Sequence, residues 1–562
     1  MTSTTPRARL AIIGCTFVAL AACASSSATT AVNSTTAIDS TSSSTSRLAT
    51  TVPLDIATTQ VPGTAVQTSQ VSTTSAVTTT TVHASSGPRP GATTLHLKAG
   101  PFDIQPGQNN IDTTFTGVQQ PSGPGWIVGF RPNLHFDDPS KPNRLGAIPA
   151  VDDVHLHHGV WLSFPHKDAT RPSLPAERFF AAGEEKTSLT LPEPYGYRFA
   201  AGDHWVLNYM LHNLRDDTKK VWITYDVDFI PDTAPQAASV SSARPLWMDV
   251  QNGSVYPVFD VLMGAGTHGT YTYPDQASNP YGSGPHLNAW TVDRAGVLIA
   301  TAGHLHPGGL HTDLWVTRSG KKSRLFSSVA NYYEPAGAVS WDVSMTATRP
   351  TWRAAVRQGD VLSISATYDS ARASWYESMG IMIVWMGAPS AAAPDPFATK
   401  VDGPGVLTHG HLAENDNHGG ANFLGYVDLT NEAAVPSTPA PPSIDIQNWV
   451  YAVGDMGGAT AVPTVQAGQP ITFHNSDANI GKGQWHTITS CRAPCNKSTG
   501  IAYPLADGPV IFDSGELGLG GAPTANRDAW TWTVPAGTPA GTYTYFCRIH
   551  PLMRGAFRVT TP

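Results

Sequence analysis

Short runs in which apolar and polar residues alternate make up most of the chain from about residue 93 to Gly387. The first of these runs, TTLHLKAG, and later ones such as DVHLHHGVWLSF place every second side chain on the same face of an extended backbone. A period of two is typical of β-strands. The pattern therefore predicts an all-β protein built from sandwich domains.

The composition agrees with many short strands joined by turns. The 562 residues include 51 glycines and 46 prolines, and charged residues make up 14%. This length predicts about three or four domains. The 34 basic and 42 acidic residues give a net charge of -8, which argues against a nucleic-acid partner.

Breaks in the alternation predict the domain boundaries. The segment QAASVSSARP separates a first β-sandwich, residues 93–240, from a second, residues 241–397. A histidine-containing loop and the proline-rich STPAPPSID form a linker over residues 398–445. A last domain then covers residues 446–562.

The N-terminal pattern predicts export. Arg7 and Arg9 precede the apolar run LAIIGCTFVALAA, which is too short to cross a bilayer and ends in LAAC. This order resembles the lipobox of bacterial lipoproteins, which implies a signal peptide over residues 1–22 and lipidation of Cys23. An ordinary secretory signal is the alternative. The Ser/Thr-rich residues 23–92 predict a disordered tether, so the protein is expected outside the cytoplasm, anchored to the membrane only by lipid, or secreted.

Three cysteines remain once the signal segment and its cleavage site are set aside. Cys491 and Cys495, with three residues between them, predict a small loop disulfide in an oxidising compartment. Cys547 is then left unpaired. An unpaired thiol is a liability outside the cytoplasm, so we expect a metal to bind it.

The stretch TYFCRIHPLMRG places Cys547, His550 and Met553 within seven residues. A thiolate, imidazoles and a thioether suit copper better than the oxygen-preferring magnesium, calcium or manganese. Two histidines, a cysteine and a weakly bound methionine form the blue-copper arrangement. The second histidine should come from an earlier strand, and GQWHTITS offers His486.

The segments PTVQAGQPITFHNSD, WHTITS and GTYTYFCRIHPLMRG together resemble a small cupredoxin, most like amicyanin and plastocyanin, over about residues 446–562. The resemblance implies a Greek-key β-sandwich that holds one type 1 copper. The ligands that it implies are His486, Cys547, His550 and Met553.

Histidines also cluster on predicted strands in the middle of the chain. Residues two apart on a strand face the same side, so His304 and His306 in GHLHPGG can chelate one metal. The same periodicity pairs His155 with His157. The adjacent pair of His157 and His158 would need a bulge to converge, and the choice between these pairs stays open.

These motifs, in this order, resemble the copper type II ascorbate-dependent monooxygenases, such as peptidylglycine α-hydroxylating monooxygenase, and also plant stress-upregulated nodulin-like proteins. The resemblance spans about residues 93–390 and implies two jelly-roll-like sandwiches that each hold a copper. The implied ligands are His157, His158 and His212 for an electron-relay copper and His304, His306 and Met379 for a catalytic copper. Met382 and Met386 are alternatives to Met379.

A further group, THGHLAENDNHGG, places His409, His411 and His418 in a loop. The group either binds a metal or seats the last domain against the middle domains.

Together these features predict an extracytoplasmic, membrane-anchored copper oxidoreductase. A redox partner protein or small reductant would supply electrons to the last domain, and His304, His306 and Met379 would act on a small-molecule or peptide substrate. A non-enzymatic electron-transfer or copper-handling lipoprotein is the alternative. A multicopper oxidase or nitrite reductase ranks lower, because Phe546 stands where those enzymes place a histidine before the cysteine.

Overall fold

The structure is a computed structural model in which Ala76–Pro562 form one compact unit. The predicted signal peptide, Cys23, Cys495 and His418 lie outside the residues that it describes. The described residues are 88–108, 115–151, 153–215, 217–250, 259–262, 264–276, 288–333, 342–371, 375–415, 432–479, 484–491, 512–519, 527–547, 549–550 and 552–562.

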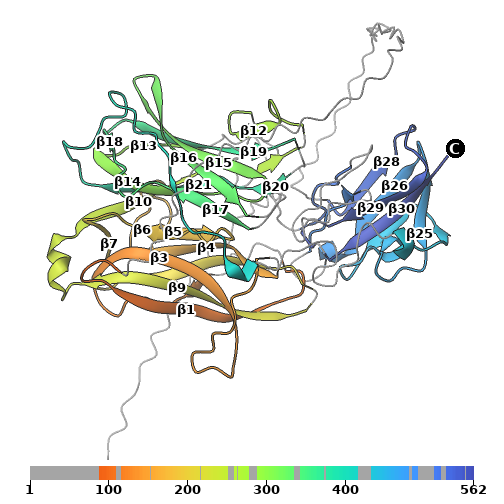
Figure 1. The fold of residues 1–562 in the computed structure, drawn as a ribbon, viewed down its shortest axis with the longest axis horizontal. Helices are drawn as coiled ribbons and strands as arrows, with labels where there is room; N and C mark the ends of the chain where they lie inside the picture. Colours follow the sequence, from red (N-terminus) through yellow and green to blue (C-terminus); the bar gives the residue numbers. More distant parts are fainter. Residues whose placement is uncertain are drawn as a thin grey trace, which may run out of the picture. The chain divides into compact units, whose positions relative to one another are not determined.

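The all-β prediction is confirmed, because strands dominate the described residues (Figure 1). The helices among these residues are short 3-10 turns, and none has the length and apolarity that crossing a bilayer requires. They are η1 (Pro235–Ser239), η2 (Ala413–Asn415), η4 (Glu432–Ala434), η5 (Ala452–Gly454) and η6 (Ser476–Asn479).

Two sheets that pack face to face form the first sandwich. The ring of Phe130 lies 5.0 Å from that of Trp161 and 4.2 Å from that of Phe180, so aromatic side chains of both sheets meet in the core. One sheet contains β1 (Thr93–Ile104), β9 (Lys219–Pro231), β3 (Gly125–Phe136), β6 (Leu189–Thr190) and β7 (Tyr195–Phe199), and the other β2 (Phe115–Gly117), β8 (His204–Asn213), β4 (Val154–Phe164) and β5 (Glu177–Gly183).

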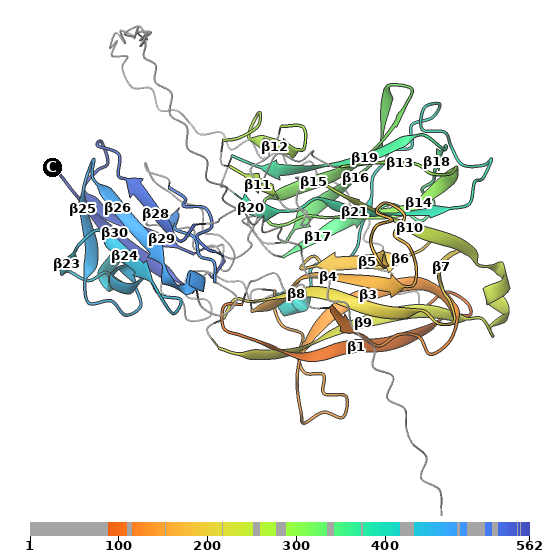
Figure 2. The ribbon, with the colours of Figure 1, turned by 180° about the vertical axis from the view of Figure 1, so that it is seen from behind.

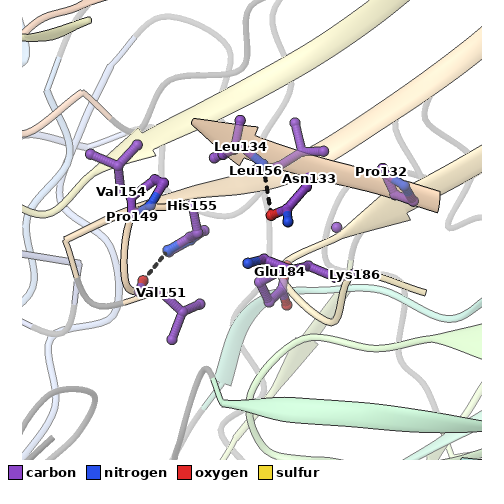
Figure 3. A pocket seen from close by; sticks show the side chains of 11 residues that line it. Pro132, Asn133, Leu134, Pro149, Val151, Val154, His155, Leu156, Glu184 and Lys186 are labelled. Carbon is purple, nitrogen blue, oxygen red and sulfur yellow. Dashed lines mark hydrogen bonds between the residues drawn. The ribbon is translucent and has the colours of Figure 1, made fainter. Parts of the chain in front are cut away.

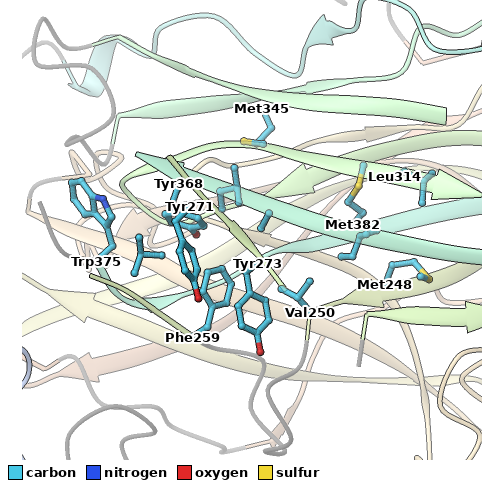
Figure 4. Close-up of a cluster of buried hydrophobic side chains, with 14 of the residues drawn as sticks. Met248, Val250, Phe259, Tyr271, Tyr273, Leu314, Met345, Tyr368, Trp375 and Met382 are labelled. Carbon is cyan, nitrogen blue, oxygen red and sulfur yellow. The ribbon is translucent and has the colours of Figure 1, made fainter. Parts of the chain in front are cut away.

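Hydrogen bonding continues from the first sandwich into the second, because β10 pairs with β7 at Ser241 and with β21 along its length. Side chains from β10, β17 and β21 meet those from β12, β15 and β19 in a second core (Figure 4). The strands are β10 (Ser241–Asp249), β11 (Phe259–Val261), β12 (Thr270–Tyr273), β13 (Ala289–Thr291), β14 (Gly296–His304), β15 (Gly309–Arg318), β16 (Lys321–Tyr332), β17 (Val343–Ala347), β18 (Ala354–Val356), β19 (Val361–Asp369), β20 (Trp375–Ser378), β21 (Ile381–Gly387) and β22 (Val406–Leu407).

A third sandwich is built from the C-terminal strands, seen from behind in Figure 2. Strand pairing begins at Pro439, and several pairs, such as β25 with β30, are parallel. One sheet contains β23 (Pro439–Ala440), β25 (Val462–Gln466), β30 (Arg554–Thr560), β29 (Gly541–Phe546) and β27 (Thr489–Cys491), and the other β24 (Ser443–Ile446), β26 (Pro470–Asn475) and β28 (Ala529–Thr533). Tyr545, Phe473 and Phe557 are buried between them.

Strand β4 departs from the expected alternation. Of its eleven residues only Val160 and Phe164 are not buried. Its neighbours in the sheet are β5 and β8, and its apolar side chains fill the first core. Its other face meets the second sandwich, because Val160 packs against Met379 and Trp247. The strand that carries His155, His157 and His158 is therefore covered on both sides.

A buried carboxyl at the start of β5 makes the stability of the first sandwich depend on pH. Burial raises the pKa of Glu177 from 4.5 to about 7, while the Tyr197 hydroxyl, which donates to it at 2.7 Å, opposes the shift. Since the folded-state pKa is raised, the protonated carboxyl stabilises the fold at low pH. This contribution is lost as the pH rises from about 4.5 to about 7.

We expect Glu177→Gln to remove this loss, because the amide stays neutral and still accepts the Tyr197 hydrogen bond. Between about pH 5 and about pH 8 the variant should gain about 2–3 kcal/mol over the wild type, measured by urea unfolding. The exposed Glu193→Gln is the matched control. Parallel pH curves for wild type and Glu177→Gln would contradict the prediction.

Candidate metal centre

Three predicted ligands converge at one end of the third sandwich. Cys547 directly follows β29, His550 lies in the loop before β30, and His486 pairs with Leu517 in an isolated bridge. The loop is held closed because the Cys547 N–H donates to the Met553 carbonyl at 3.1 Å and the Met553 N–H donates to the His550 carbonyl at 2.9 Å.

The donor atoms of these residues lie close enough to bind one ion. Nδ1 of His486 and Nδ1 of His550 are 3.1 Å apart, and they lie 3.9 Å and 3.7 Å from the sulfur of Cys547. All three side chains have an exposed fraction of 0%. Among the described residues, this is the single group of three such donors within 4.8 Å of one another.

Hydrogen bonds on the far side of each imidazole fix which nitrogen faces the sulfur. Nε2 of His486 donates to the Asp477 carboxylate at 3.0 Å, and Nε2 of His550 donates to the Gly107 carbonyl at 2.5 Å. A neutral imidazole that donates through Nε2 carries its lone pair on Nδ1. Both lone pairs therefore point toward Cys547, as metal coordination requires.

The surroundings favour the thiolate form of Cys547. Burial by itself raises the pKa of the thiol. When the two imidazoles are protonated, their hydrogen bonds and charge outweigh burial, so the pKa of Cys547 lies well below its ordinary value. Two backbone N–H groups, of Thr487 and His550, also point at the sulfur at 3.4 Å. A thiolate is the form that binds metals.

Met553 is the fourth predicted ligand. Its side chain is 1% exposed and lies in the same buried cluster as Cys547. With a soft thiolate, two imidazoles and a thioether nearby, the residues present fit copper.

A β-bulge settles how the adjacent histidines of β4 are oriented. The register against β8 shifts between Leu156 and His158. Leu156 packs in the first core, and a Cβ on Gly159 would touch Leu156 and Trp161, so both positions face that core. His157 and His158 lie between them and turn away from the core together.

The bulged strand meets the end of β14 across the two sandwiches. The ring centroids of His157 and His306 are 4.5 Å apart, those of His304 and His306 are 5.1 Å apart, and those of His157 and His158 are 5.8 Å apart. His212 lies 6.3 Å from His157. The two ligand sets implied by the monooxygenase resemblance thus form one continuous group of imidazoles.

Burial keeps the β4 histidines neutral, because it lowers the pKa of His155 to about 4 and that of His158 to about 3. Neutral imidazoles are the form that binds metals. His304 differs: burial lowers its pKa, but the charges and hydrogen bond of Glu185 and the charge of Glu184 raise it to about 9. Nδ1 of His304 lies 2.9 Å from Glu185, and among the described residues its buried Nε2 has no hydrogen-bond partner.

Met379 lies outside the core of the second sandwich, whereas its alternatives, Met382 and Met386, lie within that core. Met379 packs with Trp247 and Ile381 between the sandwiches, and its N–H and that of His306 both bond the Tyr368 hydroxyl at 3.1 Å. Met382 and Met386 belong to the core of the second sandwich.

A small pocket opens behind the bulge (Figure 3). His155 and Glu184 line it together with Asn133 and Lys186. Nδ1 of His155 donates to the Val151 carbonyl at 2.7 Å, so the ring is held at the edge of the pocket.

The loop histidines bond the protein itself. Both ring nitrogens of His409 lie within hydrogen-bonding distance of carbonyl oxygens, those of Gly410 and Glu185, and His411 pairs with Asp342 at 3.0 Å. His418 lies outside the described residues. The disulfide between Cys491 and Cys495 stays a prediction, because Cys495 also lies outside them.

Sequence reasoning missed the groups that orient the ligands. Asp477, Gly107 and Glu185 each bond a histidine of the candidate sites. The adjacent acidic residues Glu184 and Glu185, directly after a strand, were a local signal. Gly107 gave none, because it lies 443 residues from His550.

No protein-family profile and no curated protein matches this chain. A reduced proline-to-phenylalanine variant of amicyanin is 21% identical, with a TM-score of 0.13, and the match covers 22% of this chain and 83% of that one. A purple cupredoxin from Nitrosopumilus maritimus is 20% identical, with a TM-score of 0.14, over 21% of this chain and 98% of that one.

A copper-containing nitrite reductase from Thermus scotoductus is 16% identical, with a TM-score of 0.15. That match covers 47% of this chain, and the chain spans 55% of the reductase. The similar structures are thus cupredoxins and a copper enzyme, each over part of the chain. They do not assign the chain to a family.

Asp477 is predicted to hold both His486 and the preceding chain segment. Its carboxylate accepts the backbone N–H groups of Asn448 at 2.7 Å and Trp449 at 3.0 Å besides Nε2 of His486. We expect Asp477→Ala to leave these donors unpaired and to speed hydrogen exchange at the two amides roughly a hundredfold.

Exchange is measured by mass spectrometry on the metal-free protein. The matched control is Asp445→Ala, which removes an exposed ion pair with His474 and should have little effect. Equal exchange in both variants would contradict the prediction.

Proposed function

We propose that the protein is a copper oxidoreductase in which the third sandwich is a blue-copper electron-transfer domain. Its ligands are His486, Cys547, His550 and Met553. The observation that carries the proposal is the convergence of two Nδ1 atoms and the sulfur of Cys547 within 4.8 Å of one another among fully buried residues.

Copper bound by such donors gains or loses one electron with little change in geometry. The chain supplies the conditions for this. Asp477 and the Gly107 carbonyl hold the imidazoles in place, and the closed loop from Cys547 to Met553 resists rearrangement. Burial excludes water from the ligands.

In the proposal, the third sandwich exchanges electrons with a second copper site at the histidine group of the first two sandwiches. His157, His158 and His306 would hold copper there, with His304 oriented by Glu185, and Met379 close by would favour the reduced ion. The bulge that turns His157 and His158 to one side and the buried Nε2 of His304 support this part. The reaction would be monooxygenase-like, with a small-molecule or peptide substrate and electrons from a redox protein or small reductant.

In the proposal, the protein lies on the outer face of a bacterial membrane, to which lipid on Cys23 would anchor it. The support is the segment LAAC after a short apolar run.

A non-enzymatic electron-transfer or copper-handling protein is the second candidate. It is favoured by the fact that, in the described part of the chain, no histidine set of the first two sandwiches brings three donors within 4.8 Å of one another. The number of copper ions per chain separates the two candidates.

We expect Cys547→Ser to abolish the visible colour of the copper-loaded protein, because the serine hydroxyl cannot replace the thiolate as a soft donor. Met553→Leu should retain the colour but shift the reduction potential, since the axial ligand tunes it. Met456→Leu, at another buried methionine, is the matched control. A wild-type protein that stays colourless when loaded with copper and oxidised would refute the blue-copper assignment.

We expect the wild type to bind more than one copper per chain, and His306→Phe to reduce the content while leaving the visible colour intact. Copper is measured by elemental analysis after removal of loosely held metal. His204→Phe, at an exposed histidine stacked on Phe164, is the control. A content of one copper in both wild type and His306→Phe would favour the second candidate.

A further inference from the structure

The segment after the second sandwich crosses back to the first. Strand β22 pairs with β17, and residues 408–415, which we call the strap, continue from it to the turn of residues 183–188 at the end of β5. Nε2 of His409 lies 2.5 Å from the Glu185 carbonyl oxygen of this turn. The carbonyl of His409 accepts the hydroxyl of Tyr333, at the end of β16, at 2.8 Å. One residue of the strap therefore contacts both sandwiches.

The two contacts lie beside the histidine group. On the first sandwich, the side chain of Glu185 orients His304. On the second, Tyr332 directly precedes the tyrosine that bonds the strap. Its hydroxyl donates to the Gly309 carbonyl at 2.8 Å, and the Gly309 N–H donates to the His306 carbonyl at 3.0 Å. The strap thus joins the two sandwiches at the end where the imidazoles meet.

An ion pair and a buried amide fasten the end of the strap. Nζ of Lys186 lies 2.7 Å from the carboxylate of Glu414, and these side chains are only 14% and 17% exposed. Lys186 has a φ of +45°, which is strained for a residue with a side chain. The side chain of Asn415 accepts the Val151 N–H at 2.9 Å and donates to Asp342 at 3.0 Å, so it bonds to both sandwiches.

Polar contacts alone hold the strap beyond its first residue. The start is anchored, because the Thr408 N–H donates to the Met345 carbonyl at 3.0 Å and extends the pairing of β22 with β17. Of residues 409–415 only Asn415 is buried, and none belongs to a hydrophobic core. A segment with few apolar contacts opens at a lower free energy than the core does. The strap can therefore lift while both sandwiches stay folded.

We propose that the strap is a lid over the histidine group, closed by the pair of Lys186 and Glu414, and that small molecules reach the imidazoles of β4 when it lifts. His158 pairs in the sheet with Gly183, the first residue of the turn that the strap holds. The proposal concerns access to these histidines. It requires no copper there, and so goes beyond the proposed function.

The test measures access to His157 and His158 in the full-length, metal-free chain. Diethyl pyrocarbonate, a small reagent that modifies neutral imidazoles, is added near neutral pH, and mass spectrometry follows the peptide that contains both residues. They are 5% and 8% exposed, so the wild type should react slowly. Glu414→Gln leaves the buried cation of Lys186 unpaired, and we expect the modification to speed up roughly tenfold.

Hydrogen exchange shows which part of the variant opens. In Glu414→Gln the amides of the strap should exchange faster, while those of β9 and β19 in the two sandwiches keep their wild-type rates. Asp232→Asn, which breaks the more exposed ion pair with Arg198, is the matched control and should leave both measurements unchanged. Restoring the pair with reversed charges, Lys186→Glu with Glu414→Lys, should return both rates toward those of the wild type.

Three results would overturn the lid. The first is a wild-type modification rate in Glu414→Gln. The second is faster exchange throughout β9 and β19, because the sandwiches and not the strap would then have opened. The third is a rate that stays high in the folded charge-reversed variant. Since no copper is used, the outcome is independent of the copper content that tests the proposed function.

Discussion

The candidate metal centre depends on two hydrogen bonds that lie outside it. By donating through Nε2 to Asp477 and to the Gly107 carbonyl, His486 and His550 must present Nδ1 to Cys547. If either ring turned over, its lone pair would point at an acceptor and the thiolate would lose a partner. Such a reversal is unfavourable because the three donors are fully buried, so a ring that turned over could not replace its lost hydrogen bond with one to bulk solvent.

The histidines between the first two sandwiches are also oriented by groups around them. A single extra residue in β4 turns His157 and His158 to one face, and Gly183 leaves room for the ring of His304, whose Cε1 would lie 2.7 Å from a Cβ at that position. Glu185 then orients His304 from the neighbouring turn. Backbone irregularities thus bring together imidazoles that straight strands would hold apart.

Features that depend on local sequence pattern could be predicted from the sequence. Alternation predicted the strands, and the spacing of Cys547, His550 and Met553 predicted a ligand loop, which the structure closes on itself. The sequence shows that His157 and His158 need a bulge to face the same side. It does not show that β4 has one, because the register of β4 is set by its pairing with β8. Asp477 and Gly107 could not be found, since their role depends on contacts between segments that are distant in the chain.

The contact between Gly107 and His550 joins residues that are 443 positions apart. The carbonyl that orients one imidazole of the candidate centre therefore comes from the first sandwich, whose residues are all synthesised before that imidazole. The candidate centre is thus completed by a neighbouring domain, and a third sandwich produced alone would lack this acceptor.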